Sequence, residues 1–71
     1  MSSSLYVIVG VTGPLGAAIA RALHKRGDRV RGVNRSGHGK VPSGVELVAA
    51  DVKDASIARQ VCAGATVVFH C

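Results

Sequence analysis

The sequence predicts an α/β domain, half of a doubly wound parallel sheet in the order β-α-β-β-α-β. Short apolar runs alternate with helical patterns along the 71 residues, and the first run passes directly into a glycine-rich turn. Continuous, β-branched apolar runs are typical of strands that are buried on both faces of a parallel sheet. Right-handed crossovers then predict the sheet order 3-2-1-4, with the two helices on opposite faces.

The first half of the chain predicts a strand, a turn, a helix and a second strand. The first strand covers Leu5–Val9, and the helix begins at Pro14, whose missing N–H is harmless in a first turn. Gly27 follows two basic residues and is expected to end this helix, after which Arg29–Asn34 forms the second strand. The apolar stripe expected to face the sheet consists of Leu15, Ile19, Ala22 and Leu23.

The second half begins with a loop over residues 35–44, which holds three glycines, one proline and two serines. Asp54 has the residue type and position of a helix N-cap. The remaining elements are expected at Val45–Ala49 (strand), Ala55–Cys62 (helix) and Ala65–His70 (strand). We therefore expect residues 1–71 to form one partial domain that is cut short after the fourth strand.

Charge and composition narrow the range of partners. Nine Lys and Arg against four Asp and Glu give a net charge of +5, which is common in nucleic-acid-binding proteins. Seven of the nine basic residues, however, lie between residues 21 and 40, on one helix flank and the loop beyond it. Aromatic residues make up only 3%, which disfavours the stacking of bases on rings. We expect no nucleic-acid partner, and a local anion site within the basic segment stays open.

Signals for export, membrane insertion and metal binding are weak. The longest apolar run, Leu5–Val9, is far shorter than a membrane span, and residues 1–4 carry no basic side chain. We therefore expect a cytoplasmic protein without a membrane partner. Cys62 and Cys71 lack the C-x-x-C spacing of a metal or redox site, so no metal is expected. His70 ends the last strand and is expected to be packed rather than catalytic.

The turn from Gly10 to Gly16 has the spacing G-x-x-G-x-x-G. Gly10 allows the strand to turn sharply, Gly13 lets a pyrophosphate approach the backbone, and Gly16 lets the helix pack closely on the sheet. The helix that follows presents free N–H groups and the positive end of its dipole to phosphates. An ordinary glycine-containing turn is the alternative, but the position between a strand and a helix favours a dinucleotide site.

Three segments carry a resemblance to a known family. Val9–Gly16 resembles the V-T-G-A-T-G-type turn of extended and atypical short-chain dehydrogenases/reductases, which include the NAD-dependent epimerase/dehydratase proteins. Ala50–Asp54 is similar to their G-D-[LIV]-x-D segment, and Ala63–Cys71 to their G-x-D-x-V-[FI]-H-x-A segment. Ala50 replaces the usual Gly, and Thr66 replaces the usual Asp. The resemblance covers nearly the whole chain and implies the NAD(P)-binding half of a Rossmann-type domain.

The resemblance also implies contacts along a bound dinucleotide. They are Thr12, Pro14, Leu15 and Gly16 at the pyrophosphate; Asn34, Arg35 and Ser36 at the adenosine ribose; Asp51 and Val52 at the adenine; and Cys71 at the nicotinamide-side ribose. Asp51 has a competing interpretation, because a carboxylate at this point also serves as a turn or capping residue. Cys71 stands where a larger apolar residue is common in the family.

The residue types after the second strand favour NADP(H), with NAD(H) as the alternative. NAD-preferring domains place Asp or Glu here to bind the ribose hydroxyls, and no carboxylate lies between residues 29 and 45. Asn34 is neutral, and Arg35 can pair with a 2′-phosphate in a bidentate manner. Either Arg31 or Lys40 could raise the local potential further. The alternative is that Arg35 simply begins a solvated loop.

The reaction itself is not visible in these residues. The resemblance implies a catalytic Tyr-x-x-x-Lys pair, but the single tyrosine, Tyr6, is followed four positions later by Gly10. The expected function is the cofactor half of an oxidoreductase, epimerase or dehydratase, whose small-molecule substrate would bind through residues beyond this chain. The alternative is a non-catalytic NADP-sensing regulator of the atypical branch, and nucleic-acid binding is the weakest option. Self-association is left open.

Overall fold

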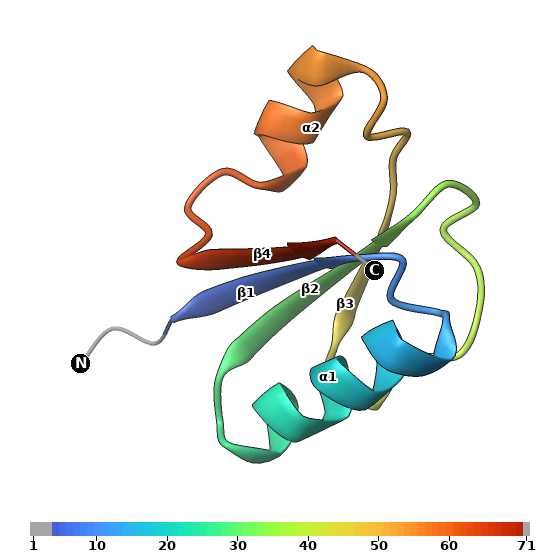
Figure 1. Cartoon of the computed structure of the whole chain (residues 1–71). Coiled ribbons are helices and arrows are strands. Elements are labelled where there is room, and N and C mark those ends of the chain that lie inside the picture. The colour runs from blue at the N-terminus through green and yellow to red at the C-terminus, as the bar shows by residue number, and fades with distance from the viewer. Residues whose placement is uncertain (1–3, 71) are drawn as a thin grey trace.

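The computed structural model describes residues 4–70 of the chain (Figure 1). Its elements are β1 (Leu5–Val9), α1 (Pro14–Lys25), β2 (Arg29–Asn34), β3 (Glu46–Ala49), α2 (Ala55–Val61) and β4 (Val67–His70). The expected elements are all present, with bounds that differ by at most two residues. All strand pairs are parallel, and the sheet order is β3-β2-β1-β4, which confirms the predicted half of a doubly wound Rossmann-type sheet.

The register brings the carboxyl ends of the strands to one edge of the sheet. Val9 at the end of β1 lies opposite Val33 of β2 and His70 of β4. Hydrogen bonds continue past the strand ends: the Gly10 N–H donates to the Val33 carbonyl at 2.9 Å, and the Ala50 N–H donates to the Asn34 carbonyl at 2.8 Å. The segments that follow β1, β2 and β3 are therefore fixed next to one another.

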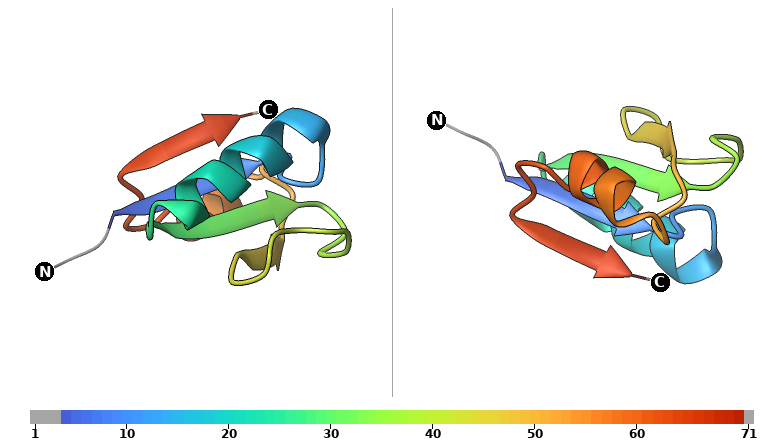
Figure 2. Two further views of the ribbon diagram at one scale, coloured as in Figure 1. Left: turned by 90° about the horizontal axis from the view of Figure 1, so that it is seen from below. Right: turned by 90° about the horizontal axis from the view of Figure 1, so that it is seen from above.

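The two helices cover opposite faces of the sheet, as the two views of Figure 2 show. Side chains alternate along each strand, so β1 buries Ile8 on the α1 side and Val7 on the α2 side, both at 0% exposure. The buried cluster beneath α1 consists of Ile8, Val11, Ala20, Leu23, Val30 and Val45. The cluster beneath α2 consists of Leu5, Val7, Val33, Ala50 and Val61.

The buried stripe of α1 differs from the one expected from the sequence. Gly16, Ala20 and Leu23 are its buried residues, whereas Leu15 is 64% exposed and Ala22 is also exposed. The reason is the close approach at Gly16, where an added Cβ would lie 2.4 Å from the Gly10 carbonyl oxygen. The first part of the helix therefore packs through Gly16 and Ala20, and the larger Leu15 is exposed next to the glycine-rich turn.

Local chemistry determines where the helices begin and end. Asp54 caps α2, since its carboxylate accepts hydrogen bonds from the backbone N–H groups of Ser56 and Ile57, as predicted. Gly27 follows α1 with a φ of +91°, which favours glycine. Neither helix in residues 4–70 has the length and apolar character needed to cross a membrane.

Candidate functional site

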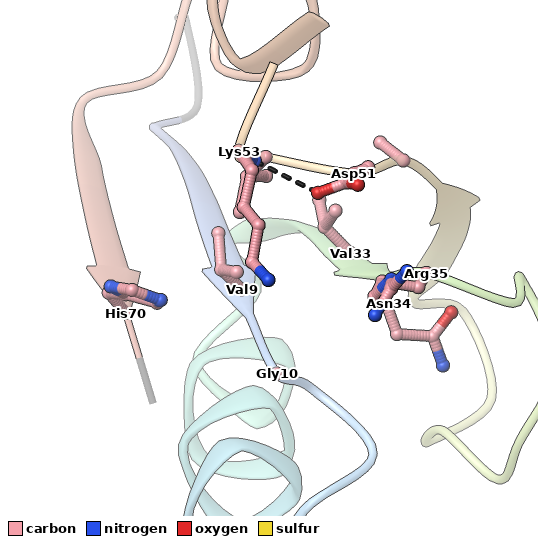
Figure 3. A pocket seen from close by; sticks show the side chains of 10 residues that line it. Val9, Gly10, Val33, Asn34, Arg35, Asp51, Lys53 and His70 are labelled. Carbon is pink, nitrogen blue, oxygen red and sulfur yellow. Dashed lines mark hydrogen bonds between the residues drawn. The ribbon is translucent and has the colours of Figure 1, made fainter. Parts of the chain in front are cut away.

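A pocket of about 420 Å³ opens at the carboxyl edge of the sheet (Figure 3). Five of the residues that the sequence singled out line it: Gly10, Asn34, Arg35, Asp51 and Val52. They come from the ends of β1 and β2 and from the segment after β3. Such a position, outside the carboxyl ends of parallel strands, is where open α/β sheets bind their ligands.

The glycine-rich turn borders this pocket and leads into α1. Gly10 has a φ of +85°, and the Gly13 N–H donates to the Gly10 carbonyl at 3.1 Å, which closes the turn. Gly13 is the N-cap of α1 and has no side chain to satisfy the N–H groups of the first helical turn. Pro14 follows it at the start of the helix, and the first turn holds no acidic residue. The turn therefore offers backbone donors and a positive dipole end to an anion.

The other predicted contact residues lie outside the lining of this pocket. Thr12 and Pro14 are exposed on the turn, Leu15 is exposed beside it, and Gly16 is buried against Gly10. Ser36 is exposed in the β2–β3 loop, where its hydroxyl accepts a hydrogen bond from the His38 N–H at 3.1 Å. Cys71 lies outside the described residues.

The side chain of Asn34 organises the loop that follows β2. Its amide Nδ2 donates to the His38 carbonyl at 2.7 Å, and its Oδ1 accepts from the Gly37 N–H at 2.7 Å. The same Nδ2 lies 3.4 Å from the Thr12 hydroxyl, so Asn34 connects this loop to the glycine-rich turn. A Cβ added at Gly39 would lie 2.5 Å from the Thr12 side chain, which shows how closely the two segments pack.

Asp51 combines a turn role with a place in the pocket. Its Oδ1 accepts a hydrogen bond from the Lys53 N–H at 3.0 Å, drawn as a dashed line in Figure 3. This is the turn role that the sequence left as an alternative. Since one oxygen is held by the backbone, the second oxygen is the one left to accept from a ligand.

The cations around the site divide into two groups. Arg35 and Lys53 line the pocket. Arg31, one of the two cations that could raise the potential there, instead pairs with Glu46 at 2.9 Å and donates to the Val61 carbonyl at 2.8 Å. Of the two alternatives, Arg31 thus lies in mid-strand on the α2 side, where it connects β2 to β3 and α2, and the role of Lys40 stays a prediction. Within residues 4–70, no cluster of three or more His, Cys, Asp or Glu side chains could hold a metal ion.

Five lining residues were not among the predicted contacts: Val9, Val33, Ala50, Lys53 and His70. His70 was expected to be packed, but it is exposed at the edge of the pocket because it sits at the very end of β4. The predicted parallel sheet could have identified Val9, Val33 and His70 as pocket residues, since the carboxyl ends of parallel strands meet at one edge of the sheet. Lys53 had only the weak signal of following Asp51 and Val52 in the chain.

Comparison with known proteins adds an independent line of evidence. The sequence pattern of the NAD-dependent epimerase/dehydratase family matches residues 6–71. The uncharacterized proteins Mb2073c of Mycobacterium bovis and MT2107 and Rv2047c of Mycobacterium tuberculosis are each 34% identical over 64 residues. These matches cover 90% of this chain and 8% of each relative, so the chain spans a small part of their length.

Two solved structures share the fold. WbmH of Bordetella bronchiseptica, solved in complex with NAD+, superposes with a TM-score of 0.81 at 25% identity. It is matched over 99% of this chain and 26% of its own. A UDP-glucose 4-epimerase superposes with a TM-score of 0.76 at 22% identity, over 94% of this chain and 22% of its own. Both are similar to this chain across nearly all of its sheet.

Proposed function

Because this chain belongs to the NAD-dependent epimerase/dehydratase family, we propose that its pocket and glycine-rich turn bind a nicotinamide dinucleotide. The observation that carries the proposal is the tight turn between β1 and α1. A side chain at Gly16 would collide with the Gly10 carbonyl, so only glycine fits there without a backbone shift. The turn begins at Gly10, which lines the pocket at the carboxyl edge of the parallel sheet, and leads to the free N–H groups at the start of α1. The protein would thus be an oxidoreductase, epimerase or dehydratase that uses this part as its cofactor half.

The residues present fit the chemical groups of a dinucleotide. An added Cβ at Gly13 would meet only the Gly10 carbonyl, at 3.4 Å, so the backbone there is open to a pyrophosphate. The pocket is lined by apolar side chains, suited to an adenine ring, and by the Asp51 carboxylate, suited to its exocyclic amine. The proposed contacts are Thr12, Gly13, Pro14, Leu15 and Gly16 at the pyrophosphate, Asn34, Arg35 and Ser36 at the ribose, Asp51 and Val52 at the adenine, and Cys71 toward the nicotinamide.

The role of these residues in the reaction is to bind and orient the cofactor. The dinucleotide supplies hydride transfer when it is bound. The turn fixes its pyrophosphate, and the apolar walls of the pocket exclude water from the base. A non-catalytic NADP-sensing role is the second candidate, and these 71 residues, which hold no Tyr-x-x-x-Lys pair, do not separate it from the enzyme. A Tyr-x-x-x-Lys pair elsewhere in the full-length protein would support a catalytic function.

We further propose that NADP(H) is preferred over NAD(H). Arg35 lines the pocket just after β2, and neither it nor Asn34 carries a negative charge that would repel a 2′-phosphate. A guanidinium can bind such a phosphate through two parallel hydrogen bonds. The comparisons give this preference no support, because the family is described as NAD-dependent and the neighbour with a named cofactor, WbmH, holds NAD+.

Calorimetric titration of the full-length protein with NADPH and NADH tests both parts of the proposal. Arg35→Ala should weaken NADPH by about ten- to a hundred-fold, because a hydrogen bond to a charged group contributes about 1.5–3 kcal/mol, and should leave NADH nearly unchanged. Arg59→Ala is the matched control, since Arg59 is an exposed cation of α2 that does not line the pocket. NADH binding as tight as NADPH, with Arg35→Ala indifferent to both, would refute the NADP preference alone. Failure of the wild type to bind either would refute the function.

A further inference from the structure

Lys53 extends into the pocket from the side opposite the glycine-rich turn. Its side chain runs from the segment after β3 across the pocket toward Val9 and Gly10 at the end of β1 (Figure 3). The hydrogen bond from its own backbone N–H to Asp51 holds this part of the chain in a turn. The backbone of Lys53 is thus held by the same turn that places Asp51 in the pocket, and its side chain is exposed.

The ammonium group of Lys53 has no carboxylate partner among residues 4–70. The ion pairs there join Arg26 to Asp28 and Arg31 to Glu46. The nearest acidic residue in sequence, Asp51, uses one oxygen for the backbone turn. A lysine that lines a pocket without an acidic partner leaves a positive charge for a ligand to neutralise.

The two cations of the pocket come from different elements. Arg35 follows β2, whereas Lys53 extends from the segment after β3 toward Val9 in the view of Figure 3, and both line the pocket. Positive charge at the start of the turn adds to that of the helix dipole and its free N–H groups. An anion held by the turn therefore gains most from Lys53, and an anion near the end of β2 gains most from Arg35.

We propose that Lys53 is a further cofactor-contact residue, whose ammonium group pairs with the 5′-diphosphate of the bound nucleotide. The proposal rests on the proposed function and deepens it, since it assigns separate cations to the two anionic groups of NADPH. Arg35 pairs with the 2′-phosphate, and Lys53 pairs with the diphosphate that NADH and NADPH share. Lysine suits this position because a flexible point charge can follow a diphosphate without a fixed geometry.

The test measures binding of four probes to the full-length protein: adenosine, 5′-ADP, NADH and NADPH. Lys53→Met keeps the apolar stem and removes the charge, so 5′-ADP, NADH and NADPH should each weaken by about ten-fold, and adenosine should not change. Lys53→Arg should keep most of the affinity. Arg59→Met is the matched control for the lost charge, and thermal unfolding of each variant shows that the fold is kept.

Two results would overturn the assignment of Lys53. Wild-type affinity of Lys53→Met for 5′-ADP would show that no diphosphate contact exists. An equal loss for adenosine and 5′-ADP would assign the side chain to the base instead. Both results concern the affinities of the Lys53→Met variant. If the proposed function fails, the wild-type protein itself does not bind the dinucleotide. The two failures are therefore distinguishable.

Discussion

Asn34 shows how one side chain can serve both a loop and a ligand site. Its amide donates to the His38 carbonyl and accepts from the Gly37 N–H, and only an amide carries a donor and an acceptor in this arrangement. Its neutrality also leaves the end of β2 without the carboxylate of an NAD-preferring domain. A substitution here therefore affects the loop and the cofactor preference through separate causes.

Asn34→Asp should weaken NADPH binding more than Asn34→Ala does. Both variants lose the hydrogen bond to His38, which should lower the free energy of unfolding by about 1 kcal/mol. The carboxylate alone adds repulsion of a 2′-phosphate, and it can accept from the ribose hydroxyls of NADH. Titration of both variants with NADPH and NADH checks this, alongside thermal unfolding. Equal NADPH affinity in the two variants would contradict it.

Gly16→Ala and Gly13→Ala form a matched pair within one turn. The Cβ added at Gly16 lies 2.4 Å from the Gly10 carbonyl oxygen, so backbone must shift, and we expect a loss of about 1–3 kcal/mol in unfolding free energy. At Gly13 the corresponding distance is 3.4 Å, an ordinary contact, so stability should be kept while dinucleotide affinity falls. Circular dichroism melts and cofactor titrations measure the two effects. Similar melting temperatures for the two variants would argue against this assignment of roles.

At the scale of elements, α2 depends on contacts outside itself. It spans seven residues, too few for a helix to be stable alone in water. The contacts that hold it include the Asp54 cap, the buried Val61 side chain, the packing of Ile57 and the hydrogen bond from Arg31 to the Val61 carbonyl. The position of α2 behind the pocket thus depends on residues from β2 and from the preceding turn.

The Asp54 cap makes the stability of α2 depend on pH. Hydrogen bonds from the Ser56 hydroxyl and from the Ile57 and Ser56 N–H groups lower the pKa of Asp54 below its ordinary value of 3.8. A carboxyl whose pKa is lower in the folded state stabilises the fold above the unfolded-state value, and this contribution is lost as the pH falls through the folded-state value. Stability should therefore decline below pH 3.8.

Asp54→Asn separates capping from titration. Asparagine caps about as well as aspartate but takes up no proton, so the variant should lose less stability on acidification than the wild type. Denaturant unfolding at a series of pH values measures this difference. Parallel pH profiles for the two proteins would rule out a contribution from Asp54.

At the scale of the whole molecule, the sheet ends in an apolar edge. β4 is the outermost strand next to β1, and its Val67 and Val68 are 39% and 45% exposed. Tyr6 stacks on Phe69 with ring centroids 6.4 Å apart, which joins β4 to β1 on the α1 side. Parallel sheets are normally covered on both faces, and an exposed apolar edge favours pairing with another chain.

We expect the isolated 71-residue chain to be marginally stable and to self-associate through this edge. Val68→Lys should reduce association, because a charged edge residue opposes strand pairing, whereas Ala18→Lys on the exposed side of α1 should not. Sedimentation velocity over a range of concentrations measures the association. A monomer that unfolds cooperatively at high temperature would contradict the expectation.

The sequence alone determined the order of the elements and the positions where local chemistry dominates. Local interactions decide the strand at Leu5–Val9, the helix cap at Asp54 and the end of the helix at Gly27. They involve residues that are close in sequence, so the sequence is enough to predict them. The spacing from Gly10 to Gly16 also predicted the turn, since each glycine answers a local steric demand. Of the residues that line the pocket, Gly10 followed from this spacing, whereas Asn34, Arg35, Asp51 and Val52 were expected through the family resemblance.

Only the tertiary structure decided which side chains meet. The face that α1 buries depends on how closely Gly16 approaches Gly10, which a stripe of large apolar residues does not encode. The partners of Asn34 come from its own loop and the turn. Lys53 lines the pocket because the segment after β3 lies near the ends of β1 and β2. Such contacts join residues distant in sequence, and their geometry arises from packing the whole sheet rather than from the preferences of any one segment.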